Sequence, residues 1–221
     1  MTSEATSHPS AAAAAHDPYR IHSVEELRTL YDMPNEVILK TQFSFLDDYA
    51  IRFIAQSSLV CIASQMDGRI DASPRGGAPG FVQVLDRKTL AIPDWPGNNK
   101  IETLTSIIHS GRCGLLFLVP RQDMFLRVHG TAVVTRDPAL LQAMQVESKP
   151  PKLAIKLQVL QAYFHCGKAL RRSKIWQPES WPPAHVLPTA GKMILDQAKL
   201  ADSSAEELES MYQKSLRETL Y

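Results

Sequence analysis

Short runs in which apolar residues alternate with polar ones fill the middle of the chain, and this pattern predicts β-strands. Turn signals separate the runs. The strongest signal is Asp67-Gly68, because an Asp-Gly pair suits a two-residue hairpin turn. The run over 125–137 is long, and we expect it to bend at Gly130. The predicted strands cover residues 58–65, 69–73, 81–86, 89–94, 113–119, 125–137 and 152–165.

Helical spacing of apolar residues appears on either side of these runs. Ser23, followed three residues later by Glu26, forms a capping box that predicts a helix over 23–31. Pro138 near the start of the segment 137–145 is typical of the first turn of a helix. Further helices are predicted over 37–55, over 100–109 and, as a charged amphipathic tail with a capping signal at Ser203-Ser204, over 196–221.

The order of these elements predicts the fold class. One helix inserted between the fourth and fifth strands is too little helix for a parallel doubly wound sheet. About six strands at regular spacing favour a closed antiparallel barrel, and therefore a mainly β (α+β) fold. We expect a disordered lead over 1–20, the barrel domain over 21–197 and a C-terminal amphipathic helix over 198–221.

Composition narrows the classes of function. The chain has 24 Lys+Arg and 23 Asp+Glu, a net charge of +1, so no general electrostatic attraction draws it to nucleic acid or to an anionic membrane. The longest apolar run, 113–120, is far shorter than the roughly 20 residues of a membrane span, and residues 1–18 lack the features of a secretory signal. We therefore expect a cytoplasmic protein that binds neither nucleic acid nor membrane.

The three cysteines are Cys61, Cys113 and Cys166, and they form no C-x-x-C pair. An odd, sparse set of this kind argues against a disulfide framework and against a zinc site, so we expect no metal. Cys61 and Cys113 lie in apolar runs and are interpreted as packing residues of strands. His165-Cys166 is interpreted as a positioned pair at an interface, because no acidic residue or second histidine lies at metal-ligand spacing.

Two loops combine features that suit an anion. Residues 73–80 bring Arg75 into a glycine-rich turn, where the backbone can approach a ligand closely and the guanidinium can hold a phosphate with two hydrogen bonds. Residues 93–100 run from a strand to a predicted helix start, where free N–H groups, Asn amides and Lys100 favour an anion. Each loop alone is more simply a turn, with Asn98 as an N-cap. The functional interpretation is one phosphate that touches both loops.

At these residues the chain resembles a known family. The run SPRGGAPGFVQVLDRKTLAIPDWPGNNKIETL, followed by GLLFLVP, LRVHGTA and YFHCGKALRRSKIW, is similar to the FMN-dependent flavoproteins of the pyridoxamine 5′-phosphate oxidase type. The resemblance covers residues 24–197 and keeps these pieces in order. It implies FMN as the cofactor and the FMN-binding fold of that family, a six-stranded antiparallel split β-barrel with flanking helices.

The resemblance also implies which residues bind FMN. Arg75 and the triplet Asn98-Asn99-Lys100 would hold the phosphate, and the anion argument selects the same residues. Members of the family bind FMN at the two-fold interface of a homodimer, and the second chain would add residues from 165–176. Backbone groups around Ser73, Pro93 and Asp94 would line the flavin ring beside Gly76, and the second chain would contribute Lys168, Arg172, Lys174 and Trp176.

The segment 168–176 has its own chemical interpretation. Lys168, Arg171, Arg172 and Lys174 lie close in sequence to Trp176, and basic groups beside an indole suit an anionic, aromatic ligand. The alternative is a solvated basic helix face with Trp176 as a buried plug.

The predicted function is that of an FMN-dependent oxidoreductase, which transfers a hydride between flavin N5 and a small aromatic or heteroaromatic substrate. The R-x-V-L-L-K stretch of pyridoxamine phosphate oxidases is absent, because the corresponding strand reads IDASPRG, so specific vitamin B6 oxidation is not expected. No side chain indicates a catalytic acid or base. The alternatives are a non-catalytic flavin- or haem-binding protein with the same barrel, and a deazaflavin-dependent reductase.

Overall fold

Residues 17–221 are described by a computed structural model, and the chain divides into two units, Met1–Leu39 and Lys40–Tyr221. In the first unit, helix α1 (Val24–Arg28) begins where the capping signal predicts, because Ser23 Oγ accepts a hydrogen bond from the Glu26 N–H at 3.1 Å. Helix α1 buries none of its residues. The disordered lead expected over 1–20 lies, as far as residue 16, outside the described residues.

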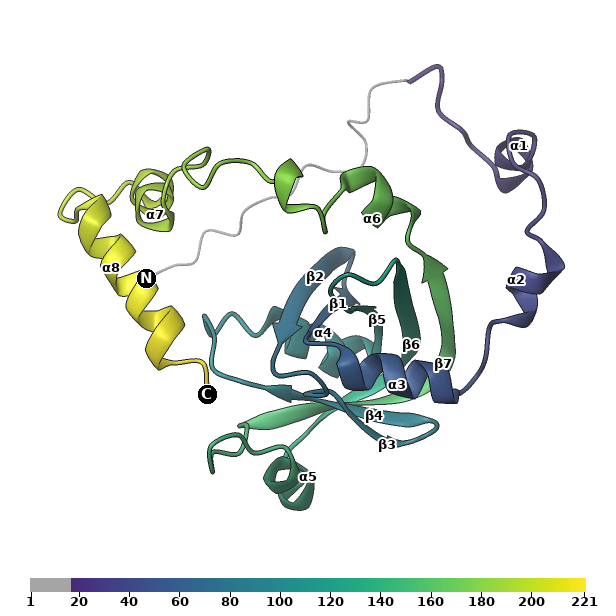
Figure 1. The fold of residues 1–221 in the computed structure, drawn as a ribbon, viewed down its shortest axis with the longest axis horizontal. Coiled ribbons are helices and arrows are strands. Elements are labelled where there is room, and N and C mark those ends of the chain that lie inside the picture. The colour runs from purple at the N-terminus through teal and green to yellow at the C-terminus, as the bar shows by residue number, and fades with distance from the viewer. Residues whose placement is uncertain (1–16) are drawn as a thin grey trace. The chain divides into compact units, whose positions relative to one another are not determined.

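A seven-stranded antiparallel sheet forms the centre of the second unit, with the strand order β2-β1-β5-β6-β7-β4-β3 (Figure 1). The strands lie within a few residues of the predicted runs. They are β1 (Leu59–Met66), β2 (Arg69–Gly76), β3 (Gln83–Asp86), β4 (Thr89–Asp94), β5 (Arg112–Leu118), β6 (Met124–Thr135) and β7 (Leu153–Cys166).

Two expectations about this sheet are wrong. All seven predicted runs form paired strands, so the predicted count of six is too low. The short strand β3 belongs to the sheet because it pairs with β4 in a hairpin. The sheet is also not closed by hydrogen bonds, because β2 and β3 are its two edges. Pro74 on β2 suits an edge strand, since proline has no N–H to offer a further neighbour. The fold is therefore a mixed α/β fold with an open antiparallel sheet.

The expected bend at Gly130 is confirmed. The pairing of β6 with β7 shifts register between His129 and Gly130, which is a β-bulge. A Cβ atom at Gly130 would collide with the backbone carbonyl of Gln158. Only glycine therefore allows the two strands to approach this closely.

Three helices of the second unit pack beside the sheet. Helix α3 (Asp48–Gln56) precedes β1, α4 (Glu102–Ser110) joins β4 to β5, and α5 (Pro138–Ala143) joins β6 to β7. Pro138 lies in the first turn of α5 as predicted. The main core lies among the sheet, α3 and α4, and includes Leu46, Ile54, Val60, Ile62, Leu90, Ile92, Ile107, Phe117, Leu126, Val128 and Leu157. A smaller cluster beside α5 contains Ala91, Leu140, Met144 and Ala154.

The single helix expected over 37–55 is wrong. The chain instead forms α2 (Glu36–Lys40) and α3, and between them Phe43 exchanges two backbone hydrogen bonds with Ala162 of β7. Asp47 starts the new helix, because its Oδ1 accepts a hydrogen bond from the Ala50 N–H at 2.8 Å.

Four helical segments follow β7 in the order α6 (Lys168–Ser173), η2 (Pro178–Ser180), α7 (Ala190–Ala198) and α8 (Ala205–Glu218) (Figure 1). The single helix expected over 196–221 is wrong, because Lys199 in the left-handed conformation ends α7. The capping signal is confirmed at Ser204, which forms a capping box with Glu207. Across the described residues, none of the helices combines the length and apolar character that crossing a membrane requires.

Candidate functional site

Arg75 is half-buried on β2, and its guanidinium is held by three contacts. Its Nη1 donates hydrogen bonds to Ser73 Oγ at 2.7 Å and to the Pro74 carbonyl at 2.9 Å. Its Nε lies 3.5 Å from Oδ1 of Asp94, the last residue of β4. These contacts fix the guanidinium, so its remaining N–H groups are oriented in advance for a ligand.

The geometry of β2 explains why Ser73 and Arg75 lie together. Alternate residues of a strand share one face, and Asp71, Ser73 and Arg75 are the half-buried positions of β2. Gly76 ends the strand, and the following Gly77 N–H donates to the carbonyl of Ser58 at 3.1 Å. The glycine-rich loop is thereby anchored directly after Arg75.

Asp94 is the residue of this cluster whose side-chain role the sequence did not reveal, since only its backbone was assigned to the site. Burial raises the pKa of the Asp94 carboxyl, and the neighbouring Arg75 guanidinium acts in the opposite direction. The side chain retains 20% exposure. The sequence does contain a signal for this role, because Asp94 ends the apolar run TLAIPD. A carboxylate beside a buried strand requires a hydrogen-bonding or charged partner.

The loop after β4 presents Asn98, Asn99 and Lys100 to solvent. The Asn98 Oδ1 accepts a hydrogen bond from the Lys100 N–H at 3.1 Å. The alternative interpretation of Asn98 as the N-cap is wrong, because α4 begins at Glu102 and its N-cap is Ile101. Ile101 has a left-handed backbone conformation, and its side chain caps no N–H group. The first turn of α4 therefore offers N–H groups that no N-cap side chain satisfies, and such groups favour an anion.

Strand β2 also holds the start of α4. Thr103 Oγ1 donates a hydrogen bond to Asp71 Oδ2 at 2.7 Å, and Arg69 lies 3.7 Å from the carboxylate of Glu102. The Cα atoms of Asp71 and Arg75 are about 13 Å apart at the usual rise of a strand. Strand β2 therefore links Arg75 to the start of α4, which follows the loop that carries Lys100.

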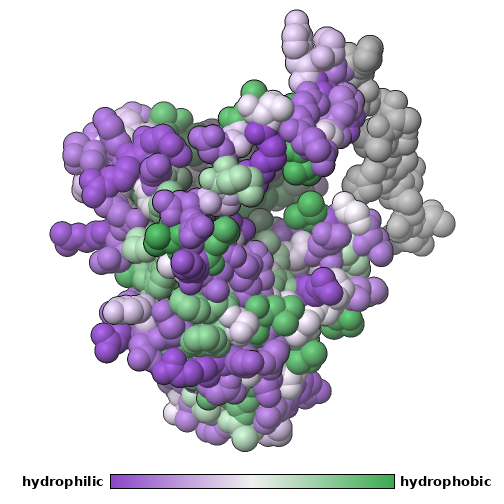
Figure 2. Space-filling model, turned by 90° about the vertical axis from the view of Figure 1, so that its right-hand side faces the viewer, coloured by the Kyte–Doolittle hydropathy of each residue, from purple (hydrophilic) through white to green (hydrophobic). Residues whose placement is uncertain are grey.

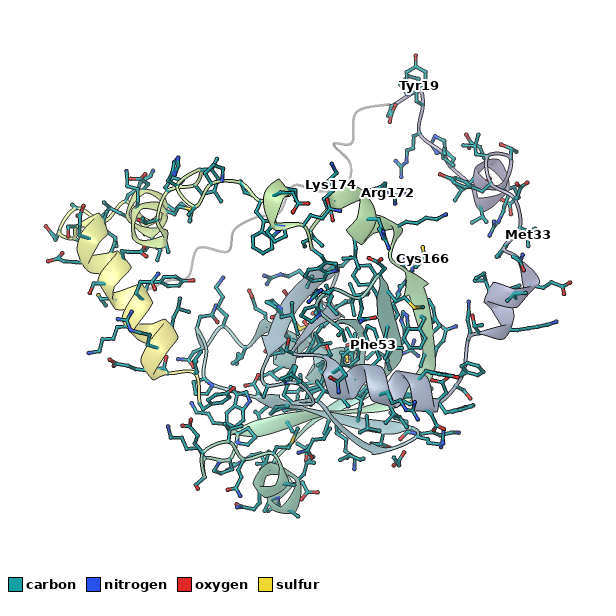
Figure 3. All side chains as sticks on the ribbon, in the orientation of Figure 1. Tyr19, Met33, Phe53, Cys166, Arg172 and Lys174 are labelled. Atoms are coloured by element: carbon teal, nitrogen blue, oxygen red, sulfur yellow. The ribbon has the colours of Figure 1, made fainter. Side chains whose placement is uncertain are left out.

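The basic segment after β7 makes its contacts elsewhere. Arg171 forms an ion pair with Asp123, and Trp176 Nε1 donates to the carbonyl of Gln122 at 3.2 Å, so this segment is anchored to the turn between β5 and β6. Figure 3 shows Arg172 and Lys174 near each other at α6. Lys168, Arg172 and Lys174 are exposed, and Trp176 is half-buried.

Cys61 on β1 lies opposite Pro74 of β2, whereas Cys113 and Cys166 lie on β5 and β7. Cys113 is buried, which raises the pKa of its thiol to about 12, so the thiol stays neutral near pH 7. This confirms Cys113 as a packing residue; Cys61 is half-buried and Cys166 is exposed. In the part of the chain that the structure describes, no three His, Cys, Asp or Glu side chains gather as the ligands of a metal would.

A sequence profile of the family described as Pyridoxamine 5′-phosphate oxidase matches residues 46–166, more than half of the chain. The chain belongs to this family. The pyridoxamine 5′-phosphate oxidase match begins in the core at Leu46 and ends with β7, so it contains Arg75, Asp94 and the loop over 98–100. The basic segment 168–176 lies beyond it. No protein of curated function matches the sequence.

Solved structures similar to this chain include HupZ from group A Streptococcus, which is 17% identical over 53% of this chain and 91% of that chain, with a TM-score of 0.45. General Stress Protein 26 from Bacillus anthracis is 14% identical over 52% and 89% of the two chains, with a TM-score of 0.40. The FAD binding protein from Mycobacterium smegmatis is 16% identical over 56% and 97%, with a TM-score of 0.39.

The pyridoxamine 5′-phosphate oxidase core of this chain also carries an apolar pocket of about 450 Å³ between the segment 41–50 and the strands β6 and β7. Its aromatic residues are Phe43, Phe45, Tyr49, Tyr163 and Phe164. Hydrophobic side chains reach the surface among hydrophilic ones on the face drawn in Figure 2. No Lys, Arg or His lines this pocket, so it lacks the cations that a phosphate requires.

Proposed function

We propose that this chain is an FMN-dependent oxidoreductase that transfers a hydride between flavin N5 and a small aromatic or heteroaromatic substrate. The observation that carries the proposal is that β2 holds both Arg75 and, through the hydrogen bond of Thr103 to Asp71, the start of α4. Membership of the pyridoxamine 5′-phosphate oxidase family supports FMN as the cofactor.

The residues present fit the phosphate of FMN. Arg75 is fixed by Ser73 and Asp94, and a guanidinium fixed in this way can give a phosphate two parallel hydrogen bonds. Lys100 adds a second cation beside the uncapped start of α4, and Asn98 and Asn99 add amide donors. One Arg and one Lys together balance the charge of about −2 that a phosphate monoester carries near pH 7.

Backbone groups at the strand ends would hold the flavin ring, and they come from Ser73, Gly76, Pro93 and Asp94. When bound, FMN supplies the redox chemistry at N5, and the protein supplies its orientation. The Asp94 carboxylate holds the guanidinium of Arg75, which makes Asp94 a positioning residue.

A second copy of the chain would complete this site. The exposed cations Lys168, Arg172 and Lys174 lie near Trp176, and basic groups beside an indole suit an anionic, aromatic cofactor. Because the family binds its cofactor between two subunits, we expect these residues to reach the cofactor of the other subunit. The proposed functional form is a homodimer with FMN at the subunit interface.

Turnover tests this function. The purified protein, supplied with FMN, is reduced anaerobically by NADH or NADPH and then offered a panel of quinone, nitroaromatic and heteroaromatic acceptors, with free FMN as the control. We expect reoxidation faster than that of free FMN with at least one acceptor. A protein that binds FMN but accelerates no acceptor is a binding protein, and one that retains haem or a deazaflavin in preference to FMN contradicts the cofactor assignment.

A further inference from the structure

A pocket of about 210 Å³ lies at the end of β4, beside the glycine-rich loop that follows Arg75. Successive residues of a strand point to opposite faces. Asp94 accordingly pairs with Arg75, whereas its neighbours Pro93 and Trp95 line the pocket. The other walls come from the glycine-rich loop after β2, from the end of α5 and from Tyr221. None of the residues assigned to the phosphate lines the pocket.

Tyr221 forms one wall of this pocket through two contacts. Its ring meets Trp95 edge to face, with the centroids 5.0 Å apart and the planes at 87°. The Lys149 Nζ donates a hydrogen bond to the Tyr221 carbonyl at 3.4 Å. Lys149 belongs to a tight turn closed by two backbone hydrogen bonds with Val146, a lining residue. These contacts hold the Tyr221 ring against the pocket.

The lining determines what kind of ligand the pocket can take. None of the side chains that line it is charged, so none can form an ion pair with a ligand. Three aromatic rings, Phe81, Trp95 and Tyr221, line it together with the thioether of Met144. Aromatic edges and sulfur both attract a further aromatic ring. The chemistry therefore favours an uncharged aromatic molecule.

Size and polarity narrow this class. A closed apolar cavity of about 150 Å³ holds benzene, so this open pocket of about 210 Å³ has room for one substituted aromatic ring. The Gln83 Nε2 donates a hydrogen bond to the Ala143 carbonyl at 3.0 Å, which fixes the amide and leaves its Oε1 as an acceptor. A ring that carries one N–H or O–H group can donate to this oxygen.

We propose that this pocket binds a small, uncharged aromatic molecule with one N–H or O–H donor, and that Trp95 and Tyr221 are the rings in contact with it. All of the lining comes from one chain, and Pro93 is the residue that the pocket shares with the proposed flavin site. A test with simple probes and no added cofactor is therefore independent of the function proposed above.

Indole and phenol are the probes, and the full-length ¹⁵N-labelled protein is the sample. The side-chain N–H resonance of Trp95, assigned with Trp95→Phe, should shift saturably with at least one probe, whereas those of Trp176 and Trp181 should stay in place. Ala143→Phe inserts a ring from the end of α5 and should weaken binding at least about tenfold. Ala139→Phe, on the same helix but outside the lining, should leave binding unchanged.

Tyr221→Ala is a second variant, and we expect it to fold because Tyr221 is only half-buried. It should weaken binding about 2- to 10-fold, the usual contribution of one aromatic contact. Tyr212→Ala on α8 is the matched control, because Tyr212 is exposed and does not line the pocket. A Trp95 resonance that neither probe moves at millimolar concentration overturns the proposal. So does equal binding by Tyr221→Ala and Tyr212→Ala, or by a folded Ala143→Phe variant and the native protein.

Discussion

Arg75 on β2 and Asp94 at the end of β4 form an ion pair, with Nε and Oδ1 3.5 Å apart. These strands are not neighbours in the sheet, so hydrogen bonding between strands does not create this contact. Both side chains are about one-fifth exposed, at 22% and 20%, and solvent and salt screen such a pair less than a surface pair. The position of the proposed phosphate-binding arginine therefore depends on Asp94.

Asp94→Asn should change how stability depends on pH. Burial raises the pKa of Asp94 above its ordinary 3.8, so the folded state binds the proton more tightly than the unfolded state does. The stability linked to this group is present below about 3.8 and is lost as pH rises through the raised pKa. In urea unfolding between about pH 3.5 and pH 7, Asp94→Asn should therefore gain stability relative to the native protein as pH rises.

Asp86→Asn is the control for the sign of this effect. A hydrogen bond from the Lys88 N–H lowers the pKa of the exposed Asp86 carboxyl, so its contribution is present above the ordinary pKa and is lost as pH falls. The two variants should therefore show opposite trends against the native protein. Parallel trends contradict the assigned environment of Asp94.

Lys100→Ala should weaken the binding of the FMN phosphate without affecting the binding of the flavin ring. Loss of one cation on the phosphate should weaken FMN binding about tenfold, or about 1.4 kcal/mol, while binding of riboflavin, which has no phosphate, should stay unchanged. Fluorescence titrations of both flavins measure this difference. Lys88→Ala removes an exposed lysine from the turn between β3 and β4 and should affect neither flavin. An equal loss for FMN and riboflavin rules out a phosphate role for Lys100.

Gly130→Ala should destabilise the fold, because a Cβ atom there meets the Gln158 carbonyl across the bulge. The expected cost is about 1–3 kcal/mol or more, measured as the free energy of unfolding in urea. Gly97→Ala is the matched control, since a Cβ atom at Gly97 has open space around it. Equal stability of the two variants would show that the strands do not approach at Gly130 as described.

The proposed dimer site predicts complementation between two defective chains. Arg75→Ala and the double variant Arg172→Ala/Lys174→Ala should each lose FMN binding as purified homodimers. In a mixed dimer, one of the two sites takes Arg75 from one chain and Arg172 and Lys174 from the other, and is intact. Random co-assembly should therefore restore binding in about a quarter of the sites. Co-expression of the two variants with different tags allows the mixed dimers to be purified and their FMN content to be measured. Mixed dimers that bind no FMN would exclude sites shared between subunits.

The apolar runs located all seven strands. Alternate residues are buried in β1, β5 and β6, and the short run of β4 is buried on both faces, so each pattern is local to its strand. Local signals also succeeded at Ser23, Pro138 and Ser204, since a cap involves residues within one helical turn. The failures involve partners far apart in the chain. Phe43 interrupts the predicted long helix because its backbone bonds to Ala162, and no local pattern reports that bond.

The candidate site shows the same division. Arg75 and Lys100 could be selected from residue type, loop context and family resemblance. The ion pair of Arg75 with Asp94 could not, because it depends on where two non-neighbouring strands end. Similarly, the contact of Tyr221 with Trp95 joins residues from distant parts of the chain. The identity of a helix N-cap was missed because Ile101 takes a left-handed conformation that β-branched residues rarely adopt.

The role of Arg75 in holding FMN is tested by the affinity for FMN of the native protein, Arg75→Ala and Arg112→Ala, measured by quenching of flavin fluorescence. Arg112 is an exposed strand arginine on β5 and serves as the control. We expect saturable binding by the native protein and Arg112→Ala, and a loss of at least about tenfold for Arg75→Ala, as for a charged hydrogen bond. Native affinity in a folded Arg75→Ala variant, or no FMN binding by the native protein, would contradict this role.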